Sequence, residues 1–187
     1  DALPIWIDTG GSHVWHKRFK KNVAVSFFAN GDMLACGTYR YAGDTPSELG
    51  LPAAQNSDGW LARLSPTGAV LWGRRVGGPG SESSIACLVL ADATVAVAIR
   101  SNDDVVLDGL TLADDGDPIT NSVALFQIDD AGHALWGARS TGDAASFALA
   151  AGTHRLAFAA SVTGTFGFGP PPPVAGGSDI LVSAYGY

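Results

Sequence analysis

Long apolar runs are missing from this chain of 187 residues, although 47% of its residues are hydrophobic. The longest apolar stretches are interrupted by Asp92 or Gly152, so none reaches the roughly 20 residues that a membrane-spanning helix needs. We therefore expect no membrane span. The apolar residues are numerous enough to build a substantial buried core.

Basic residues are also scarce. Eleven lysines and arginines stand against 18 acidic residues, which gives a net charge of −7. Nucleic-acid binding is therefore not expected, because a protein that binds nucleic acid presents a basic surface. Four basic residues lie in one early turn and form either a solvated strand end or a patch for an anionic partner: Lys17, Arg18, Lys20 and Lys21.

Motifs of common catalytic centres are missing too. The sequence has no HExxH zinc motif, no serine nucleophile elbow and no phosphate-binding glycine loop followed by a helix. His13 and His16 lie three apart on an expected strand, so we predict that they point to opposite faces. A glycoside hydrolase needs an acid and a base at a set separation, and no motif ties two carboxylates together. The candidate carboxylates are Asp8, Asp32, Glu48, Asp58, Glu82 and Asp129.

Cysteine occurs only twice, as Cys36 and Cys87, and each lies in an apolar stretch. We interpret both as buried free thiols that behave as small apolar side chains. A disulfide would instead require their Cα atoms to lie within about 7 Å of each other.

The chain does contain one short sequence motif that is repeated around a tryptophan. Trp15, Trp72 and Trp136 lie in HVWHKRF, AVLWGRR and HALWGAR, at spacings of 57 and 64 residues. Self-similarity at such a period is typical of propellers, solenoids and arrays. The repeat units run over 1–57, 58–121 and 122–178, with a partial fourth unit at 179–187.

The openings of the units show a β-hairpin. Apolar residues alternate there with a period of two, which is typical of strands. Each hairpin turn contains a glycine, namely Gly11, Gly68 or Gly132, as a tight turn with positive φ requires.

Two further strands follow each tryptophan, within 23–37, 84–99 and 146–160. The alanine-rich stretch at 84–99 also fits a buried helix on its apolar run alone, but turn residues every eight to twelve positions favour strands. We therefore predict an all-β protein with four short strands in each unit and almost no helix.

The stretch at 164–186, GTFGFGPPPPVAGGSDILVSAYG, joins a Phe-Gly turn to an AGGSD strand opening, and LSPTGAVLWGRR supplies a glycine hairpin that leads to LW. These features resemble the bacterial SBBP repeat over essentially the whole chain. The middle unit departs from the pattern at 105–122 and the first unit at 39–58. The resemblance implies β-propeller blades on a secreted or cell-surface bacterial protein, and it carries no catalytic residue to this chain.

The number of strands is too small for a closed propeller, which typically has four to eight four-stranded blades. If a blade joins the two strands after one tryptophan to the next hairpin, the chain holds two strands of one blade, two complete blades and three strands of another. We therefore expect either a fragment of a longer propeller or several copies that close a ring together, because an open sheet edge must be protected.

The connections at 39–57, 101–121 and 161–177 occupy equivalent places in successive units, so we expect them on one side of the molecule. Loops on a rigid repeat are where binding residues concentrate, although an irregular surface loop is the alternative. The candidate ligand-binding residues are Tyr39, Arg40, Tyr41, Asp44, Asn102, Phe166 and Phe168.

The middle connection is acidic and offers oxygen ligands of the kind that calcium prefers. Its spacing matches no Asp-x-Asp-x-Asp-Gly loop, and solvated turn carboxylates are the alternative. No other cofactor is expected. The candidate calcium ligands are Asp103, Asp104, Asp114, Asp115 and Asp117.

The repeated tryptophans are better explained as packing wedges between neighbouring sheets than as sugar-binding platforms, because a large side chain recurs at one place in every unit. We expect a non-catalytic module for binding or structural assembly outside the cell, with protein or carbohydrate ligands or self-association. The alternative is a carbohydrate-active or other hydrolase that uses loop carboxylates.

Overall fold

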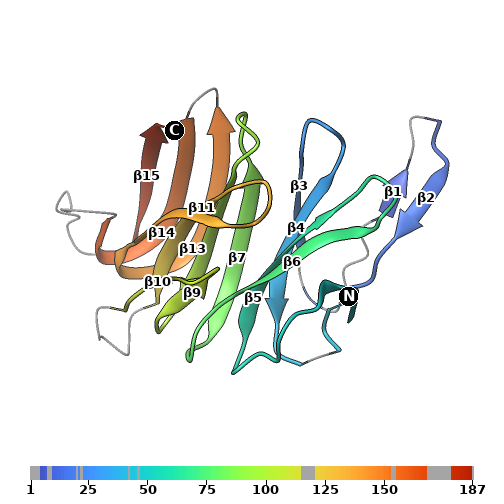
Figure 1. Ribbon diagram of the computed structural model, residues 1–187. Coiled ribbons are helices and arrows are strands. Elements are labelled where there is room, and N and C mark those ends of the chain that lie inside the picture. The colour runs from blue at the N-terminus through green and yellow to red at the C-terminus, as the bar shows by residue number, and fades with distance from the viewer. Residues whose placement is uncertain are drawn as a thin grey trace.

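The computed structural model of the protein describes residues 5–7, 10–19, 21, 23–41, 43–45, 47–114, 121–152, 155–167 and 178–186. In this part of the chain the fold is all-β, as predicted (Figure 1). Its one helical element there is a 3₁₀ turn, η1 (Ser47–Leu49). None of the described residues forms a helix with the length and apolar character to cross a membrane.

The strands form antiparallel sheets that follow one another along the chain. A two-stranded sheet contains β1 (Ile5–Ile7) and β2 (His13–His16). Sheet A has the order β3 (Val23–Phe27), β4 (Met33–Tyr39), β5 (Asp58–Leu64), β6 (Val70–Val76). Sheet B has the order β7 (Glu82–Val89), β8 (Val95–Ser101), β11 (Ser122–Ile128), β12 (Ala134–Arg139). Sheet C has the order β13 (Thr141–Gly152), β14 (Arg155–Gly167), β15 (Ser178–Gly186).

Sheets A and B have the expected composition, because each joins the two strands after one tryptophan to the hairpin of the next unit. The stretch at 84–99 forms β7 and β8 and no helix. The middle connection contains a further hairpin that the sequence analysis missed, β9 (Val105–Leu107) with β10 (Leu110–Leu112). In the described part of the chain the sheets do not close into a ring.

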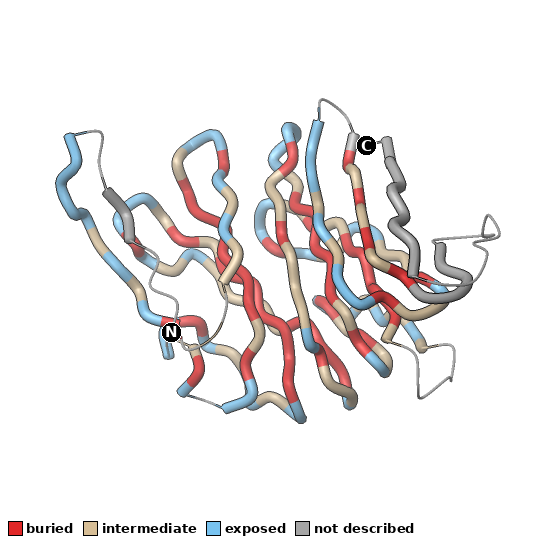
Figure 2. Tube along the Cα trace, turned by 180° about the vertical axis from the view of Figure 1, so that it is seen from behind, coloured by how far each residue is buried: buried red, intermediate tan, exposed pale blue. Residues whose placement is uncertain are grey.

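The core consists of apolar layers between sheets packed face to face. Leu34 and Leu61 of sheet A meet Val97 and Phe126 of sheet B in one layer. A second layer lies between sheets B and C, and a third covers the opposite face of sheet A. Figure 2 shows the buried residues concentrated along the central strands of this series. Trp60 belongs to the third layer, where its ring stacks on Phe19 with centroids 4.7 Å apart.

The three equivalent hairpins share a β-bulge directly before the repeated tryptophan. In β1–β2, Ile7 pairs with His13 and Trp6 with Trp15, which leaves Val14 without a partner in the ladder. The same residue is skipped in the other two hairpins, as Leu71 and Leu135. The three skipped side chains are all exposed, at 46%, 51% and 57% respectively. An extra residue in one strand explains this, because it shifts the alternation of faces by one position.

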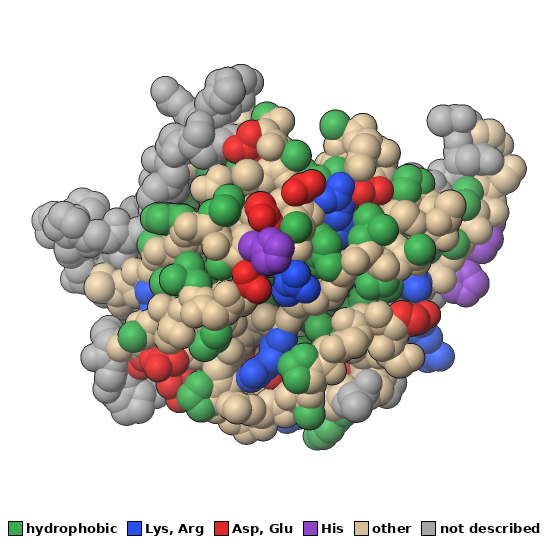
Figure 3. All heavy atoms as spheres, in the orientation of Figure 1, with side chains coloured by type: hydrophobic (Ala, Val, Ile, Leu, Met, Phe, Trp, Pro, Cys, Tyr) green, Lys and Arg blue, Asp and Glu red, His purple; other side chains and the backbone are tan. Residues whose placement is uncertain are grey.

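This bulge corrects the prediction for the two histidines of β2. His13 and His16 do not point to opposite faces, since His13 Nε2 lies 3.1 Å from His16 Nδ1. A spacing of three across a bulge acts as a spacing of two, so both rings lie on one side of the strand. Figure 3 shows histidine side chains gathered over β2 at the edge of the molecule.

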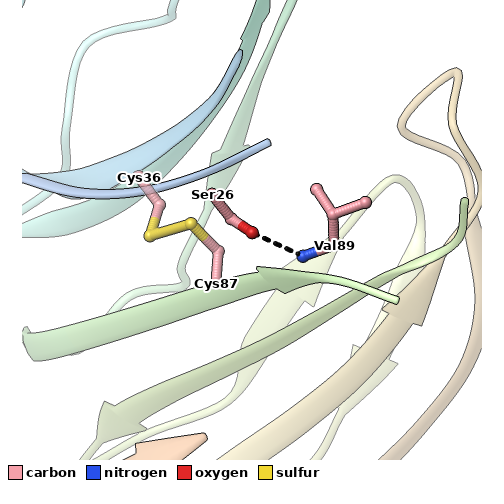
Figure 4. The surroundings of a disulfide bond; sticks show 4 residues. All are labelled: Ser26, Cys36, Cys87 and Val89. Carbon is pink, nitrogen blue, oxygen red and sulfur yellow. Dashed lines mark hydrogen bonds between the residues drawn. A yellow bond between two sulfur atoms is a disulfide. The ribbon is translucent and has the colours of Figure 1, made fainter. Parts of the chain in front are cut away.

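The cysteines are not free thiols, which corrects a second prediction. Cys36 of β4 and Cys87 of β7 form a disulfide, with their Cα atoms 6.2 Å apart (Figure 4). The two face each other because β4 and β7 belong to sheets that pack together. Beside the disulfide, the Val89 amide donates a hydrogen bond of 3.1 Å to Ser26 Oγ. Sheets A and B are therefore joined by a covalent bond and a hydrogen bond within one apolar layer.

We expect the paired substitution Cys36→Ala and Cys87→Ala to lower the free energy of unfolding by about 2–4 kcal/mol, because the disulfide constrains the unfolded chain across 51 residues. Urea denaturation followed by tryptophan fluorescence measures this change. The wild-type protein treated with a reductant should lose a similar amount, whereas the variant should not respond to the reductant. Equal stability of variant and wild type would contradict the expectation.

Candidate functional site

Two of the three repeated tryptophans, Trp15 and Trp72, lie where one sheet meets the hairpin of the next. At the first junction, Trp15 Nε1 donates a hydrogen bond of 2.8 Å to the Pro66 carbonyl. The indole also covers Gly68, where an added Cβ would lie 2.8 Å from Trp15 Cδ2. Gly68 has φ +80°, so this position requires glycine both for the turn and for the close approach of the indole.

The second junction repeats this contact and adds two arginines. Trp72 Nε1 donates a hydrogen bond of 2.9 Å to the Asp130 carbonyl and covers Gly132, which has φ +86°. Arg63 donates to the same carbonyl at 2.7 Å, and Arg74 Nε donates to the Gly132 carbonyl at 3.3 Å. The turn from Asp130 to Gly132 is thus held by one indole and two guanidinium groups.

The third tryptophan stands apart from the other two. Trp136 occupies the same place on β12 that Trp72 occupies on β6, and it pairs with Gln127 where Trp72 pairs with Arg63. Its side chain is 44% exposed, and among the described residues no turn covers it. Of the three equivalent glycines, Gly11 is correspondingly exposed, with φ +82° and no described atom within 4 Å of an added Cβ.

The candidate residues after β4 divide into a buried group and an exposed group. Tyr39 is buried and its hydroxyl donates a hydrogen bond of 2.8 Å to the Pro52 carbonyl. Burial, with a smaller contribution from Asp58, raises the pKa of Tyr39 to about 12. Asp44 is also buried, and its carboxylate accepts the amides of Arg40 and Tyr41 at 2.9 and 3.0 Å. Tyr39 and Asp44 therefore shape the loop, whereas Arg40 and the 67% exposed Tyr41 face solvent.

The acidic connection is organised around an arginine. Arg139 Nη2 lies 2.7 Å from Asp114 Oδ1, and Arg139 Nη1 donates to the Asp103 carbonyl at 2.6 Å. Asp104 Oδ1 accepts the Asp114 amide at 2.7 Å. The guanidinium group thus supplies the positive charge that these oxygens face. Asn102 is exposed, and its Oδ1 accepts a hydrogen bond of 2.9 Å from the amide of Ser81, which lies between β6 and β7.

The described residues contain no group of three or more histidine, cysteine or acidic side chains that fits a metal ion. Asp115 and Asp117 lie outside the described residues, so calcium stays a prediction. Phe166 lies within β14 but its side chain is not described, and Phe168 lies outside the described residues. The structure therefore describes only part of the three connections, and a shared binding surface on them stays a prediction.

A buried polar cluster at the junction of sheets A and B was not found from the sequence. Arg75 binds Asp58 with both ends of its guanidinium group, at 2.8 and 3.0 Å. Glu82 lies beside Asp58, its Oε1 accepts the Ser101 hydroxyl at 3.0 Å, and its amide donates to the Ser57 carbonyl at 2.7 Å. Asp58 and Glu82 are 0% and 1% exposed, whereas the Arg75 side chain is 24% exposed, so the two carboxylates are shielded from solvent and the arginine reaches it.

A signal for this cluster was present in the repeat. Arg75 and Arg139 both stand three residues after the repeated tryptophan, and Arg18 does so in the first unit. Arg139 Nε donates a hydrogen bond of 2.6 Å to Ser122 Oγ, as Arg75 does to Asp58. In both units the arginine therefore binds the residue that opens the unit.

A polar cavity of about 360 Å³ lies between sheets A and B and is lined by Lys21, Thr38, Ser83, Ser84 and Ile85. Lys21 belongs to the early basic group, and within that group Lys17 pairs with Glu48 at 3.5 Å. On the face in Figure 3 basic and acidic side chains lie interspersed over the sheets. The described residues of that face form no large area of one charge.

No known protein family matches the chain, and no curated protein matches its sequence. The resemblance to SBBP repeats therefore stays a prediction.

We expect Trp72→Ala to lower the free energy of unfolding by about 2–4 kcal/mol, because it removes a half-buried indole together with its hydrogen bond to the next sheet. Trp136→Ala is the matched control and should cost much less, since Trp136 contacts no described turn. Thermal and urea unfolding of both variants measure the difference. Equal losses would show that the turn contact contributes little.

Stability should fall as pH rises between about 4.5 and 8. Burial, together with the neighbouring Asp58, raises the pKa of Glu82 from 4.5 to about 8. In this window the folded protein keeps a proton on Glu82 that the unfolded chain releases, so rising pH favours unfolding. Urea midpoints measured at several pH values should show the fall in the wild type and a flatter profile in Glu82→Gln.

Glu48→Gln is the control for this experiment. The pKa of Glu48 is lowered by its own backbone hydrogen bond and by Lys17, so folding does not make Glu48 hold a proton as it does Glu82. This variant should keep the wild-type slope. A wild-type slope in Glu82→Gln would show that another group is responsible.

Proposed function

We propose that the chain is a segment of a β-propeller that acts outside the cell as a non-catalytic module for binding or structural assembly. The observation that carries the proposal is the contact between a repeated tryptophan and the glycine turn of the following sheet, made by Trp15 and by Trp72. This contact lies at a fixed place in the repeat, and at Trp72 it joins two successive four-stranded antiparallel sheets, as blades of a propeller require.

An extracellular location is supported by the disulfide between Cys36 and Cys87. Disulfides form and persist mainly in oxidising compartments, whereas cytosolic thiols are kept reduced. The resemblance to SBBP repeats agrees with a secreted or cell-surface protein.

The surface that suits a binding role is the connection after β4. Arg40 and Tyr41 are exposed next to each other, and the buried Asp44 carboxylate fixes the backbone of both. A tyrosine ring provides a flat face for a sugar, and an adjacent guanidinium group adds a partner for an acidic substituent. A carbohydrate with acidic groups is therefore the ligand that this surface fits best.

The hydrolase alternative receives no support from the neighbouring carboxylates of Asp58 and Glu82. Asp58 and Glu82 lie beneath the junction of sheets A and B, and Arg75 already occupies the Asp58 carboxylate. A substrate cannot reach either group without separating the two sheets.

Binding of the wild-type protein to an array of neutral and acidic oligosaccharides tests this role. We expect Tyr41→Ala and Arg40→Ala each to weaken binding about tenfold, which corresponds to roughly 1.4 kcal/mol. Phe27→Ala is the matched control, because Phe27 is also exposed but lies on β3. Equal binding by all variants would exclude this surface, and absence of binding across the array would leave structural assembly as the role.

A further inference from the structure

We propose that His13 and His16 form a surface site that chelates a divalent transition-metal ion, with Cu²⁺ bound most tightly. Both side chains are exposed on β2 at the edge of the molecule (Figure 3). Their facing nitrogens, His13 Nε2 and His16 Nδ1, lie 3.1 Å apart. The site uses other residues than the Arg40 and Tyr41 surface, so it does not depend on the proposed carbohydrate binding.

The distance between the two ring nitrogens suits two ligands of one ion. Imidazole nitrogens bind ions of this class at about 2.0–2.1 Å. Two nitrogens 3.1 Å apart then subtend an angle of about 95–102° at the ion. This angle lies between the roughly 90° of a square-planar or octahedral site and the roughly 109° of a tetrahedral site. The two rings therefore need to turn toward a common point, but they do not need to move apart.

The hydrogen bond between the rings can be replaced by metal binding without the loss of a proton. A contact between two ring nitrogens needs one nitrogen that carries a proton and one that does not. In a neutral imidazole the proton can occupy either nitrogen. Its transfer to the other nitrogen of the donor ring leaves both facing nitrogens free to bind the ion.

The β-bulge and the indole of Trp15 hold the two histidines in place. The bulge brings residues that are three apart onto one side of the strand. Trp15 lies between the histidines, donates a hydrogen bond to the Pro66 carbonyl and covers Gly68. The backbone of the site is therefore anchored to the next hairpin, and an anchored pair loses little conformational freedom when it binds an ion.

The repeat does not require histidine at either place. The other two hairpins form the same bulge with aliphatic residues and glycines at the corresponding places, which are Val70, Gly73, Ala134 and Gly137. There the Leu49 carbonyl covers Gly73 and the Leu112 side chain covers Gly137, whereas His16 is exposed. The first hairpin thus presents this face to solvent with two imidazoles on it, and formation of the bulge does not explain them.

The type of ligand selects the class of ion. Imidazole suits Cu²⁺, Ni²⁺ and Zn²⁺, whereas Ca²⁺ and Mg²⁺ prefer oxygen ligands. Within the first group, Cu²⁺ binds a given nitrogen site most tightly. The ammonium group of the adjacent Lys17 pairs with Glu48 at 3.5 Å, which reduces its repulsion of a cation. The other coordination positions of the ion face solvent and can take water or a donor group from a binding partner.

Isothermal titration of copper(II) chloride into the full chain tests the proposal. The wild type should bind one Cu²⁺ at this site. His13→Val and His16→Gln should each weaken that binding about tenfold or more, because a single imidazole loses the advantage of two linked ligands. Since His13→Val introduces the residue of the second hairpin, its unfolding midpoint without metal should match the wild type. His133→Gln is the control, because His133 is also exposed but lies beside Asp129.

Electron paramagnetic resonance of the bound Cu²⁺ identifies the ligands. The spectrum should show coupling to two imidazole nitrogens in the wild type and to one in His13→Val or His16→Gln. Equal Cu²⁺ affinity of His13→Val and wild type, or a loss in His133→Gln as large as that in His13→Val, would overturn the proposal. Either result would leave the extracellular binding module standing, since its tests use the Arg40 and Tyr41 surface.

Discussion

The structure depends on the fit of an indole against a glycine turn. At Gly68 and Gly132 two requirements meet at one residue: the turn has a positive φ, and the indole of the preceding sheet would lie 2.8 Å from a Cβ added at Gly68 and 3.3 Å from one added at Gly132. Any side chain at these positions would disturb both the hairpin and the packing between sheets. The same residue therefore serves local turn geometry and long-range packing. At the second junction the contact joins the same two sheets that the apolar layer and the disulfide join.

The repeat made much of the fold predictable. The spacing of the tryptophans predicted which strands share a sheet, and the glycines of the hairpins have the positive φ that turn chemistry requires. Period-two alternation also identified strands at 84–99 against the helical alternative. These features are local or recur in sequence, so a single chain displays them directly.

Features that depend on the packing of separate sheets were not predictable in the same way. The disulfide joins cysteines 51 residues apart, and only the contact between β4 and β7 brings them together. The bulge that puts His13 beside His16 adds one residue to β2, and no residue type in the sequence marks its position. Tyr39 had the residue type of a ligand contact, yet its strand places it in the core. The arginine three positions after each tryptophan can be read from the sequence. Its pairing with Asp58 or Ser122 cannot, because the two residues lie 17 positions apart and meet only across paired strands.

The bulges at Val14, Leu71 and Leu135 affect whether another strand can pair with the edges of these sheets. Each interrupts the hydrogen-bonding ladder within the last strand of its sheet, and each puts an apolar side chain beside the exposed edge. A foreign strand arriving at that edge would meet a backbone out of register with its own. The bulges therefore disfavour pairing of a foreign strand with these edges, which keeps the individual sheets narrow.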